Sequence, residues 1–259
     1  MPFADLPGVR LHYELEGDST LPVLVLSNSL GVNLAMWDPQ LQALAGHVRL
    51  LRYDTRGHGG SSIPEGPYTI AQLGRDVLGL LDTLGIARAY FCGLSIGGAI
   101  GQWLGVNAPD RIDKLILSNT AAKIGNDETW NARIALVQRE GLAPVISGTL
   151  DRWFTTDFRA SHPEAVARVR AMLEATKAEG YVAGCAAVRD FDLRESVARI
   201  TAPTLVIAGD ADPVTTTEDG RRLAASIPKA KYVEVPAAHL SNVQAAGAFN
   251  AALLSFLSN

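Results

Sequence analysis

The chain has 259 residues and a formal net charge of −4 at pH 7, a length that suits one large α/β domain or a domain with an insertion. Its 23 basic and 27 acidic residues form neither a basic stripe nor an acidic tail, which argues against nucleic-acid binding and against a disordered tail. Two cysteines are too few for a disulfide framework or a metal site. The N-terminus lacks the pattern of a signal peptide, and no apolar run approaches the roughly 18 residues that a membrane span needs. We therefore expect a cytoplasmic protein that does not bind membranes.

The first predicted strand covers residues 8–16. Val9 and Leu11 alternate there with Arg10 and His12, and this period of two is typical of a strand with one face on a core. We expect an antiparallel strand at the edge of a sheet, with His12 on its solvated face.

Later strands are expected to be parallel and buried on both faces, because their apolar residues are continuous rather than alternating. Helical patterns separate most of them, and this alternation predicts an α/β fold with helices on both faces of the sheet. The buried strands are predicted at 22–27, 48–53, 87–92, 114–118, 204–208 and 231–235. The helices between and after them are predicted at 37–44, 69–84, 99–107, 215–227 and 243–257.

The alternation stops between residues 122 and 197, where the pattern is helical without an intervening strand. We interpret this segment as an inserted helical cap, flanked by the two parts of one core at 1–121 and 198–259. One cap helix is expected to begin with the capping sequence Ser161-His162-Pro163-Glu164, which makes His162 a surface residue.

The turn Gly93-Leu94-Ser95-Ile96-Gly97 lies between a predicted strand and a predicted helix. Gly-x-Ser-x-Gly in this context is typical of a nucleophile elbow, in which the central serine is strained and exposed above the sheet. The glycines lack the Cβ atoms that would clash in so tight a turn. The position of Ser95 at a helix N-terminus also favours negative charge nearby. The alternative is an ordinary tight turn without a catalytic role. A nucleophile elbow is favoured only if the rest of the chain supplies catalytic partners for Ser95.

A carboxylate and a histidine follow Ser95 in the order expected for a serine hydrolase. Asp210 and Asp212 follow the strand at 204–208, and His239 follows the last strand. The carboxyl ends of parallel strands meet at one edge of the sheet, where such folds build their sites. The chemistry needs a base to take the serine proton and a carboxylate to orient that base. We predict Ser95, Asp212 and His239 as the catalytic residues. Asp210 is the alternative carboxylate, but Asp212 is favoured because it lies further out on the loop, whereas Asp210 is closer to the strand end.

The other histidines fit this role less well. His47 precedes a strand, and His58 lies among glycines in Arg56-Gly57-His58-Gly59-Gly60, which indicates a structural turn. We expect Arg56 to tie this turn to nearby backbone or carboxylates.

An acyl-transfer site also needs two N–H donors for the oxyanion. The amide after the nucleophile, that of Ile96, is one candidate. The other is the amide of Leu30, in the loop of small residues after the strand at 22–27. We predict Leu30 and Ile96 as the oxyanion hole.

These stretches resemble the α/β-hydrolase superfamily over the whole chain and, within it, the family of 3-oxoadipate enol-lactonases. The motifs that carry the resemblance are Leu26-Ser27-Asn28-Ser29-Leu30-Gly31, Leu51-Arg52-Tyr53-Asp54-Thr55-Arg56-Gly57-His58-Gly59, Phe91-Cys92-Gly93-Leu94-Ser95-Ile96-Gly97-Gly98, Ser118-Asn119-Thr120-Ala121-Ala122-Lys123-Ile124-Gly125, Arg152-Trp153-Phe154-Thr155, Gly209-Asp210-Ala211-Asp212 and Ala238-His239. Two departures are Asn28-Ser29 where many members have His-Gly, and Ile96 in place of Met. We expect the first to matter little to a backbone donor and the second to reshape the pocket wall slightly.

The resemblance implies a mostly parallel sheet of eight strands with a helical cap. It also implies hydrolysis of an enol-lactone ring in the catabolism of aromatic compounds, through an acyl-enzyme on Ser95 and without a cofactor or metal. Such a substrate is a small molecule that carries a carboxylate. Trp130, Arg133, Ile134 and Val137 share one face of a predicted cap helix. We therefore predict that Arg133 pairs with the substrate carboxylate and that Trp130 and Trp153 line the pocket. The alternative is that Arg133 pairs with a protein carboxylate or reaches water.

Other functions on the same scaffold stay open at this point. A carboxylesterase, a C–C bond hydrolase and a cofactor-free perhydrolase would use the same three catalytic residues. A non-enzymatic ligand receptor is disfavoured because Ser95, Asp212 and His239 are all present. A haloalkane dehalogenase would need Asp in place of Ser95, and a nucleotide-binding enzyme would need a glycine-rich phosphate loop that the chain lacks.

Overall fold

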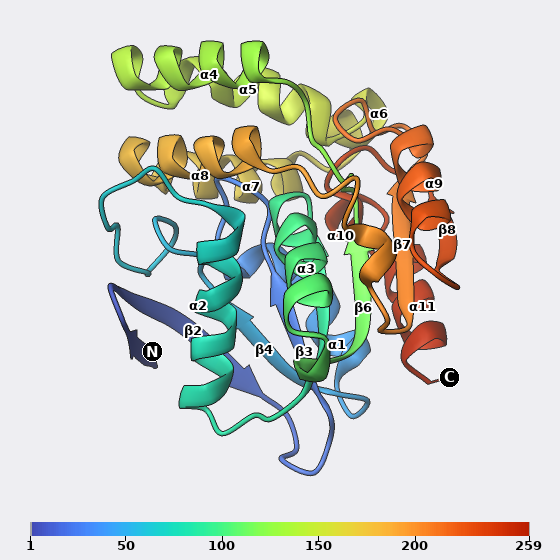
Figure 1. Cartoon of the computed structure of the whole chain (residues 1–259). Coiled ribbons are helices and arrows are strands. Elements are labelled where there is room, and N and C mark those ends of the chain that lie inside the picture. The colour runs from blue at the N-terminus through green and yellow to red at the C-terminus, as the bar shows by residue number, and fades with distance from the viewer. Residues whose placement is uncertain (1, 259) are drawn as a thin grey trace.

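The computed structural model describes residues 2–258 and forms one eight-stranded sheet (Figure 1). The spatial order of the strands is β1-β2-β4-β3-β5-β6-β7-β8, and the pairs from β4 onward are parallel. The strands are β1 (Phe3–Leu6), β2 (Val9–Glu16), β3 (Val23–Ser27), β4 (Arg49–Tyr53), β5 (Ala89–Leu94), β6 (Ile112–Ser118), β7 (Thr204–Gly209) and β8 (Lys231–Val235). All five residues of β3 and all six of β7 are buried, as their continuous apolar runs predicted.

The position of β2 corrects one expectation. β2 is antiparallel, as predicted, but it lies inside the sheet between β1 and β4, and β1 is the edge strand. His12 is therefore buried rather than solvated, and its Nδ1 lies 2.7 Å from Oδ2 of Asp54. β1 has only four residues, too few for a period of two to be recognised, so its pairing with β2 decides its structure.

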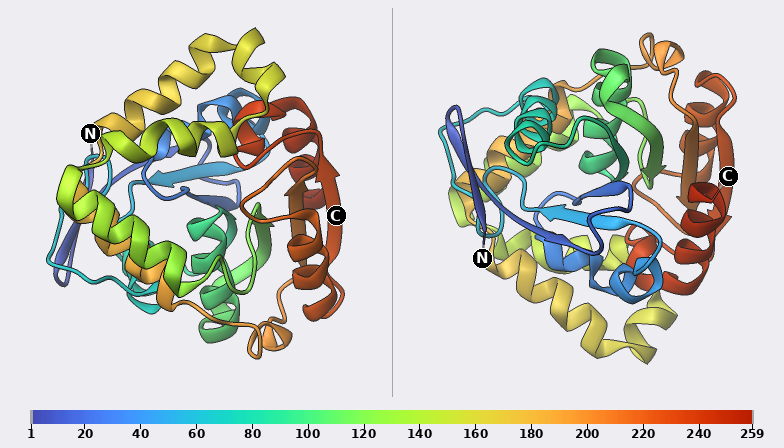
Figure 2. Two further views of the ribbon diagram at one scale, coloured as in Figure 1. Left: turned by 90° about the horizontal axis from the view of Figure 1, so that it is seen from above. Right: turned by 90° about the horizontal axis from the view of Figure 1, so that it is seen from below.

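Helices cover both faces of the sheet, as Figure 2 shows from above and below. On one face α1 (Asp38–Leu44), preceded by the 3-10 helix η1 (Leu34–Trp37), packs against α11 (Ala246–Leu257), next to α10 (Ser241–Gln244). On the other face α2 (Ile70–Thr83) packs against α3 (Ile96–Asn107), which contacts β5 and β6. Further along the sheet, α9 (Thr217–Ser226) contacts β7 and β8. Short 3-10 turns complete the core at η2 (Pro109–Arg111) and η3 (Val197–Arg199).

The segment from 122 to 197 consists of helices without a strand, and it lies across the end of the sheet at which the parallel strands finish (Figure 1). Within it α4 packs on α8 and α5 packs on α7, and α7 also contacts α6. The helices are α4 (Asp127–Glu140), α5 (Ala143–Trp153), α6 (Thr156–Ser161), α7 (Pro163–Ala175) and α8 (Ala178–Asp190). We call this segment the cap and keep 122–197 as its proposed extent.

Glycines allow the cap to approach the core closely. A Cβ on Gly180 of α8 would lie 2.0 Å from the carbonyl oxygen of Gly57, in the loop after β4. Gly57 has a φ of 80°, which residues with a side chain rarely adopt. The side chain of Arg56 beside it donates two hydrogen bonds, of 2.6 and 2.5 Å, to Asp76 of α2. The turn around His58 is thus structural and is tied by Arg56 to a carboxylate, as the sequence predicted; its contact with the cap was not predicted.

Two helix starts differ from the capping predictions. α7 begins after His162, which makes no side-chain cap hydrogen bond, so Ser161 does not cap it. α9 begins later than the predicted residue 215, since Thr216 is its N-cap residue and forms a capping box with Asp219. Thr215 lies before the helix and donates its hydroxyl to Asp212. Among residues 2–258 no helix is long and apolar enough to cross a membrane.

Candidate active site

The elbow after β5 holds Ser95 in a strained backbone conformation. Ser95 has φ 59° and ψ −115°, a region that residues with a side chain rarely adopt. The flanking glycines make this turn possible, because a Cβ on Gly93 would lie 2.1 Å from the carbonyl oxygen of Gly97. A Cβ on Gly97 would lie 2.2 Å from the carbonyl oxygen of Ser27. Helix α3 therefore begins directly after Ser95 and against the end of β3.

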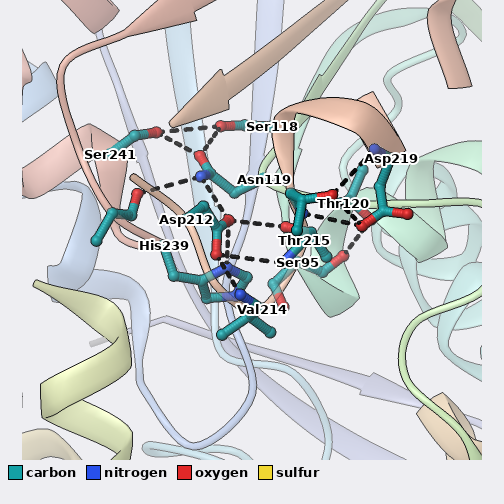
Figure 3. Close-up of polar contacts among 12 residues, drawn as sticks. Ser95, Ser118, Asn119, Thr120, Asp212, Val214, Thr215, Asp219, His239 and Ser241 are labelled. Carbon is teal, nitrogen blue, oxygen red and sulfur yellow. Dashed lines mark hydrogen bonds and ion pairs between the residues drawn. The ribbon is translucent and has the colours of Figure 1, made fainter. Parts of the chain in front are cut away.

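Asp212 and His239 meet at the ends of β7 and β8 (Figure 3). The Asp212 Oδ2 atom lies 2.8 Å from His239 Nδ1, and both side chains are buried. Asp210 accepts a hydrogen bond from the backbone N–H of Ala237, and within residues 2–258 it makes no hydrogen bond or ion pair with His239. Of the two candidate carboxylates, Asp212 is thus the one that can orient the imidazole.

The surroundings of Asp212 keep its carboxylate ionised. Burial by itself would raise the pKa of Asp212, but the attraction of His239 and hydrogen bonds from His239, Asn119 and the Val214 N–H outweigh burial and lower the pKa below its usual 3.8. The Asn119 Nδ2 atom donates to Oδ2 at 2.9 Å, and the Val214 N–H donates to Oδ1 at 2.7 Å. Thr215 adds its N–H and its hydroxyl. A carboxylate held on so many sides is fixed in position.

Ser95 and His239 line the same cavity, of about 380 Å³, below the cap. No hydrogen bond joins the Ser95 hydroxyl to the imidazole within residues 2–258, although both face this space. Catalytic hydrogen bonds are often long without substrate and shorten when it binds. The ring of Trp153 in α5 lies 6.2 Å from the His239 ring, centroid to centroid, and limits the space around the imidazole.

The two predicted oxyanion donors belong to segments that pack side by side. Ser27 is paired with Gly93 across β3 and β5, so the loop after β3 lies beside the elbow. Leu30 of that loop lines the cavity, and Ile96 is the first residue of α3. The first N–H groups of a helix have no partner inside the helix. Within the described part of the chain the N–H groups of Leu30 and Ile96 donate to no protein acceptor, which leaves both available to a ligand.

The cavity wall is apolar and cationic. Its charged residues are Arg133 of α4 and Arg152 of α5, and no aspartate or glutamate lines it. Trp130, Trp153 and Val188 supply apolar surface. The space therefore suits a small ligand that is partly apolar and carries negative charge.

Comparison with known proteins agrees with this architecture. The family model described as "alpha/beta hydrolase fold" matches residues 22–246. The chain belongs to the alpha/beta hydrolase family. Its relatives include 3-oxoadipate enol-lactonase 2 of Acinetobacter baylyi, 46% identical over 95% of this chain and 92% of the relative. 3-oxoadipate enol-lactonase 1 of the same organism is 41% identical over 92% of this chain and 89% of the relative. Among solved structures, the enol-lactonase from Burkholderia xenovorans LB400 superimposes with a TM-score of 0.98, 47% identity and full coverage of both chains.

In this hydrolase the predicted pocket residues lie together. Arg133, Trp130 and Trp153 all line the cavity with Ser95 and His239. Arg133 makes no ion pair within residues 2–258, and its Nη1 donates instead to the hydroxyl of Tyr181 at 2.8 Å. Ile96 is buried and is not among the residues that line the cavity, so its effect on the pocket wall stays a prediction.

Sequence reasoning missed three residues of the hydrolase site. Asn119, which follows β6 and has a positive φ, donates a hydrogen bond to Asp212. Tyr181 accepts a hydrogen bond from Arg133, and Arg152 lines the cavity. Arg152 directly precedes Trp153, and this neighbour was the signal that could have identified it. No local pattern identifies Tyr181, because α8 reaches α4 only in the folded cap.

Proposed function

We propose that this alpha/beta hydrolase opens the lactone ring of 3-oxoadipate enol-lactone to give 3-oxoadipate. The observation that carries the proposal is a cavity that joins Ser95 and His239 to unpaired cationic side chains. This combination fits an ester that bears its own carboxylate, and the relatives named for this reaction support the same substrate. The buried free cysteines Cys92 and Cys185 are compatible with the cytoplasmic setting that we propose.

In the first half-reaction the Ser95 hydroxyl attacks the lactone carbonyl while His239 accepts its proton. Asp212 holds the imidazole by its Nδ1 and stabilises the imidazolium that forms. The carbonyl oxygen becomes an oxyanion, for which the N–H groups of Leu30 and Ile96 are the proposed donors. The ring C–O bond then breaks, and His239 returns the proton to the departing enol oxygen. The enol becomes the ketone of the product.

In the second half-reaction water replaces the enol as the reacting group. His239 removes a proton from this water, and the resulting hydroxide attacks the acyl carbon on Ser95. The bond to the serine oxygen breaks, the serine recovers its proton from His239, and 3-oxoadipate leaves with a second carboxylate.

Arg133 is the proposed partner of the substrate carboxylate. Its guanidinium lines the cavity, and its carbon Cζ lies 5.8 Å from the ring centroid of Trp130. Trp130 is itself fixed by a hydrogen bond of 2.8 Å from its indole N–H to the carbonyl of Ile124. A fixed aromatic surface beside a cation can orient a flat ring that carries a carboxylate.

The decisive experiment is hydrolysis of 3-oxoadipate enol-lactone, followed by loss of its ultraviolet absorbance. We expect turnover by the wild-type protein and a fall in kcat of about 10⁵- to 10⁶-fold in Ser95→Ala. A neutral aryl ester, 4-nitrophenyl acetate, is assayed in parallel. Cleavage of this ester by Ser95 without turnover of the lactone would reject the substrate and keep the mechanism.

A further inference from the structure

Two arginines on neighbouring cap helices face one small cavity. Arg133 belongs to α4 and Arg152 to α5, and both line the space that holds Ser95. We call Arg133 and Arg152 the arginine pair. Some other arginines of the cap are neutralised, since Arg139 of α4 pairs with Glu140 and Arg159 of α6 pairs with Asp151 of α5.

Arg152 has no ion pair and no hydrogen bond within residues 2–258, although it is half-buried. Burial lowers the pKa of Arg152, and the positive charge of Arg133 lowers it further. Two like charges in a partly enclosed space repel each other unless an anion lies between them. The protein contributes no such anion from the cavity wall.

The partner of Arg133 orients the guanidinium without neutralising it. The Tyr181 hydroxyl accepts a hydrogen bond of 2.8 Å from Arg133 Nη1 and belongs to a buried side chain. Burial raises the pKa of Tyr181 to about 12, so the phenol is neutral at physiological pH. The full charge of both arginines is thus left for a ligand.

We propose that Arg152 is a second specificity-determining residue, which together with Arg133 clamps a single carboxylate of the substrate. Two guanidinium groups that share one carboxylate relieve their mutual repulsion and satisfy both of its oxygens. This inference rests on the proposed function for the identity of the substrate, and it extends to small carboxylates in general. The pair selects anionic esters and lactones over neutral ones of the same size.

The test compares Arg152→Met with wild type on the lactone and on 4-nitrophenyl acetate. We expect kcat/KM for the lactone to fall about 10- to 100-fold, mainly through KM, and that for the neutral ester to change less than about 3-fold. Arg152→Lys keeps a charge and should recover part of the loss. Arg139→Met, which removes a neutralised arginine of the same cap, is the matched control and should behave as wild type.

A second measurement does not depend on the lactone. Hexanoate should inhibit hydrolysis of 4-nitrophenyl acetate competitively in wild type, and its inhibition constant should rise about 10-fold or more in Arg152→Met. 1-Hexanol, which has the same chain without the charge, should be affected little by the substitution. If the lactone is not a substrate, the proposed function fails and hexanoate still tests the pair. An unchanged KM for the lactone together with unchanged inhibition by hexanoate in a folded Arg152→Met would overturn the inference.

Discussion

Asp212 of the core and the arginine pair of the cap have opposite surroundings. In the core, the Asp212 carboxylate accepts hydrogen bonds from His239, Asn119 and the residues after it, and little of it remains available to a ligand. In the cap, Arg133 donates only to neutral hydroxyls, and Arg152 has no partner within residues 2–258. The fully satisfied group is suited to fixing a catalytic geometry, whereas the unsatisfied ones are suited to binding. Asp212 thus serves the chemical step, and the arginine pair serves substrate binding. Variants of Asp212 should change kcat, and variants of the arginine pair should change KM for the lactone.

After Ser95→Ala, the largest effect is expected in the core, from Asp212→Asn. The amide cannot stabilise the imidazolium and favours the wrong tautomer of His239, so kcat should fall by about 10⁴-fold for the lactone and for 4-nitrophenyl acetate alike. Steady-state kinetics on both substrates measure this loss. Asp210→Asn is the control, because Asp210 makes no hydrogen bond or ion pair with His239 within residues 2–258. A loss confined to the lactone would contradict the assignment of Asp212 to the chemistry.

The contact between core and cap is tested by Gly180→Ala. The added Cβ would lie 2.0 Å from the Gly57 carbonyl oxygen, so the cap must move or the contact must deform. We expect the free energy of unfolding to fall by about 3 kcal/mol, with a higher KM for the lactone. Urea unfolding measures the first effect.

Gly247→Ala is the matched control for that substitution. It also replaces a helical glycine, but no atom lies within 4 Å of the added Cβ. Removing a glycine from a helix favours the folded state, so this variant should be unchanged or more stable by up to about 1 kcal/mol. Equal destabilisation of both variants would show that the glycine contact is not the cause.

In the cap, Arg133→Met should raise KM for the lactone by about 10- to 100-fold and leave kcat nearly unchanged. The physical reason is the loss of a charge-assisted contact made equally by substrate and transition state. Hydrolysis of 4-nitrophenyl acetate should change less than about 3-fold. If Arg133→Met leaves KM for the lactone at the wild-type value, Arg133 does not bind its carboxylate.

The smallest effect is expected at His58, between core and cap. Burial lowers the pKa of His58 below its usual 6.5, against the opposing effects of the Arg56 carbonyl and Asp54. The unfolded chain therefore takes up the proton first, so this part of the stability is present above pH 6.5 and is lost as the pH falls below it. Urea unfolding should show that the free energy of unfolding decreases less between pH 7 and pH 5 in His58→Gln than in wild type. His47→Gln, at an exposed position, should follow the wild-type dependence.

Local sequence patterns were sufficient for the elbow and for the positions of the parallel strands. Gly-x-Ser-x-Gly after a strand and before a helix is recognised locally, and the clash that excludes a side chain at Gly93 is with Gly97, four residues away. Continuous apolar runs such as that of β3 identify buried strands, and parallel strands bring their following loops to one edge of the sheet. These rules by themselves predict that Ser95, His239 and the loop with Leu30 lie near one another.

Contacts between distant segments decided the rest. The sequence left Asp210 and Asp212 as alternatives, and only the packing of β7 against β8 brings Asp212 to His239. The burial of His12 follows from β1 and Asp54, neither of which its own strand reveals. Whether a charged side chain is neutralised also depends on its neighbours in space. The neighbouring Trp153 could indicate that Arg152 lies near the pocket, but only the folded structure shows that Arg152 lines the cavity of Ser95 without a partner within residues 2–258.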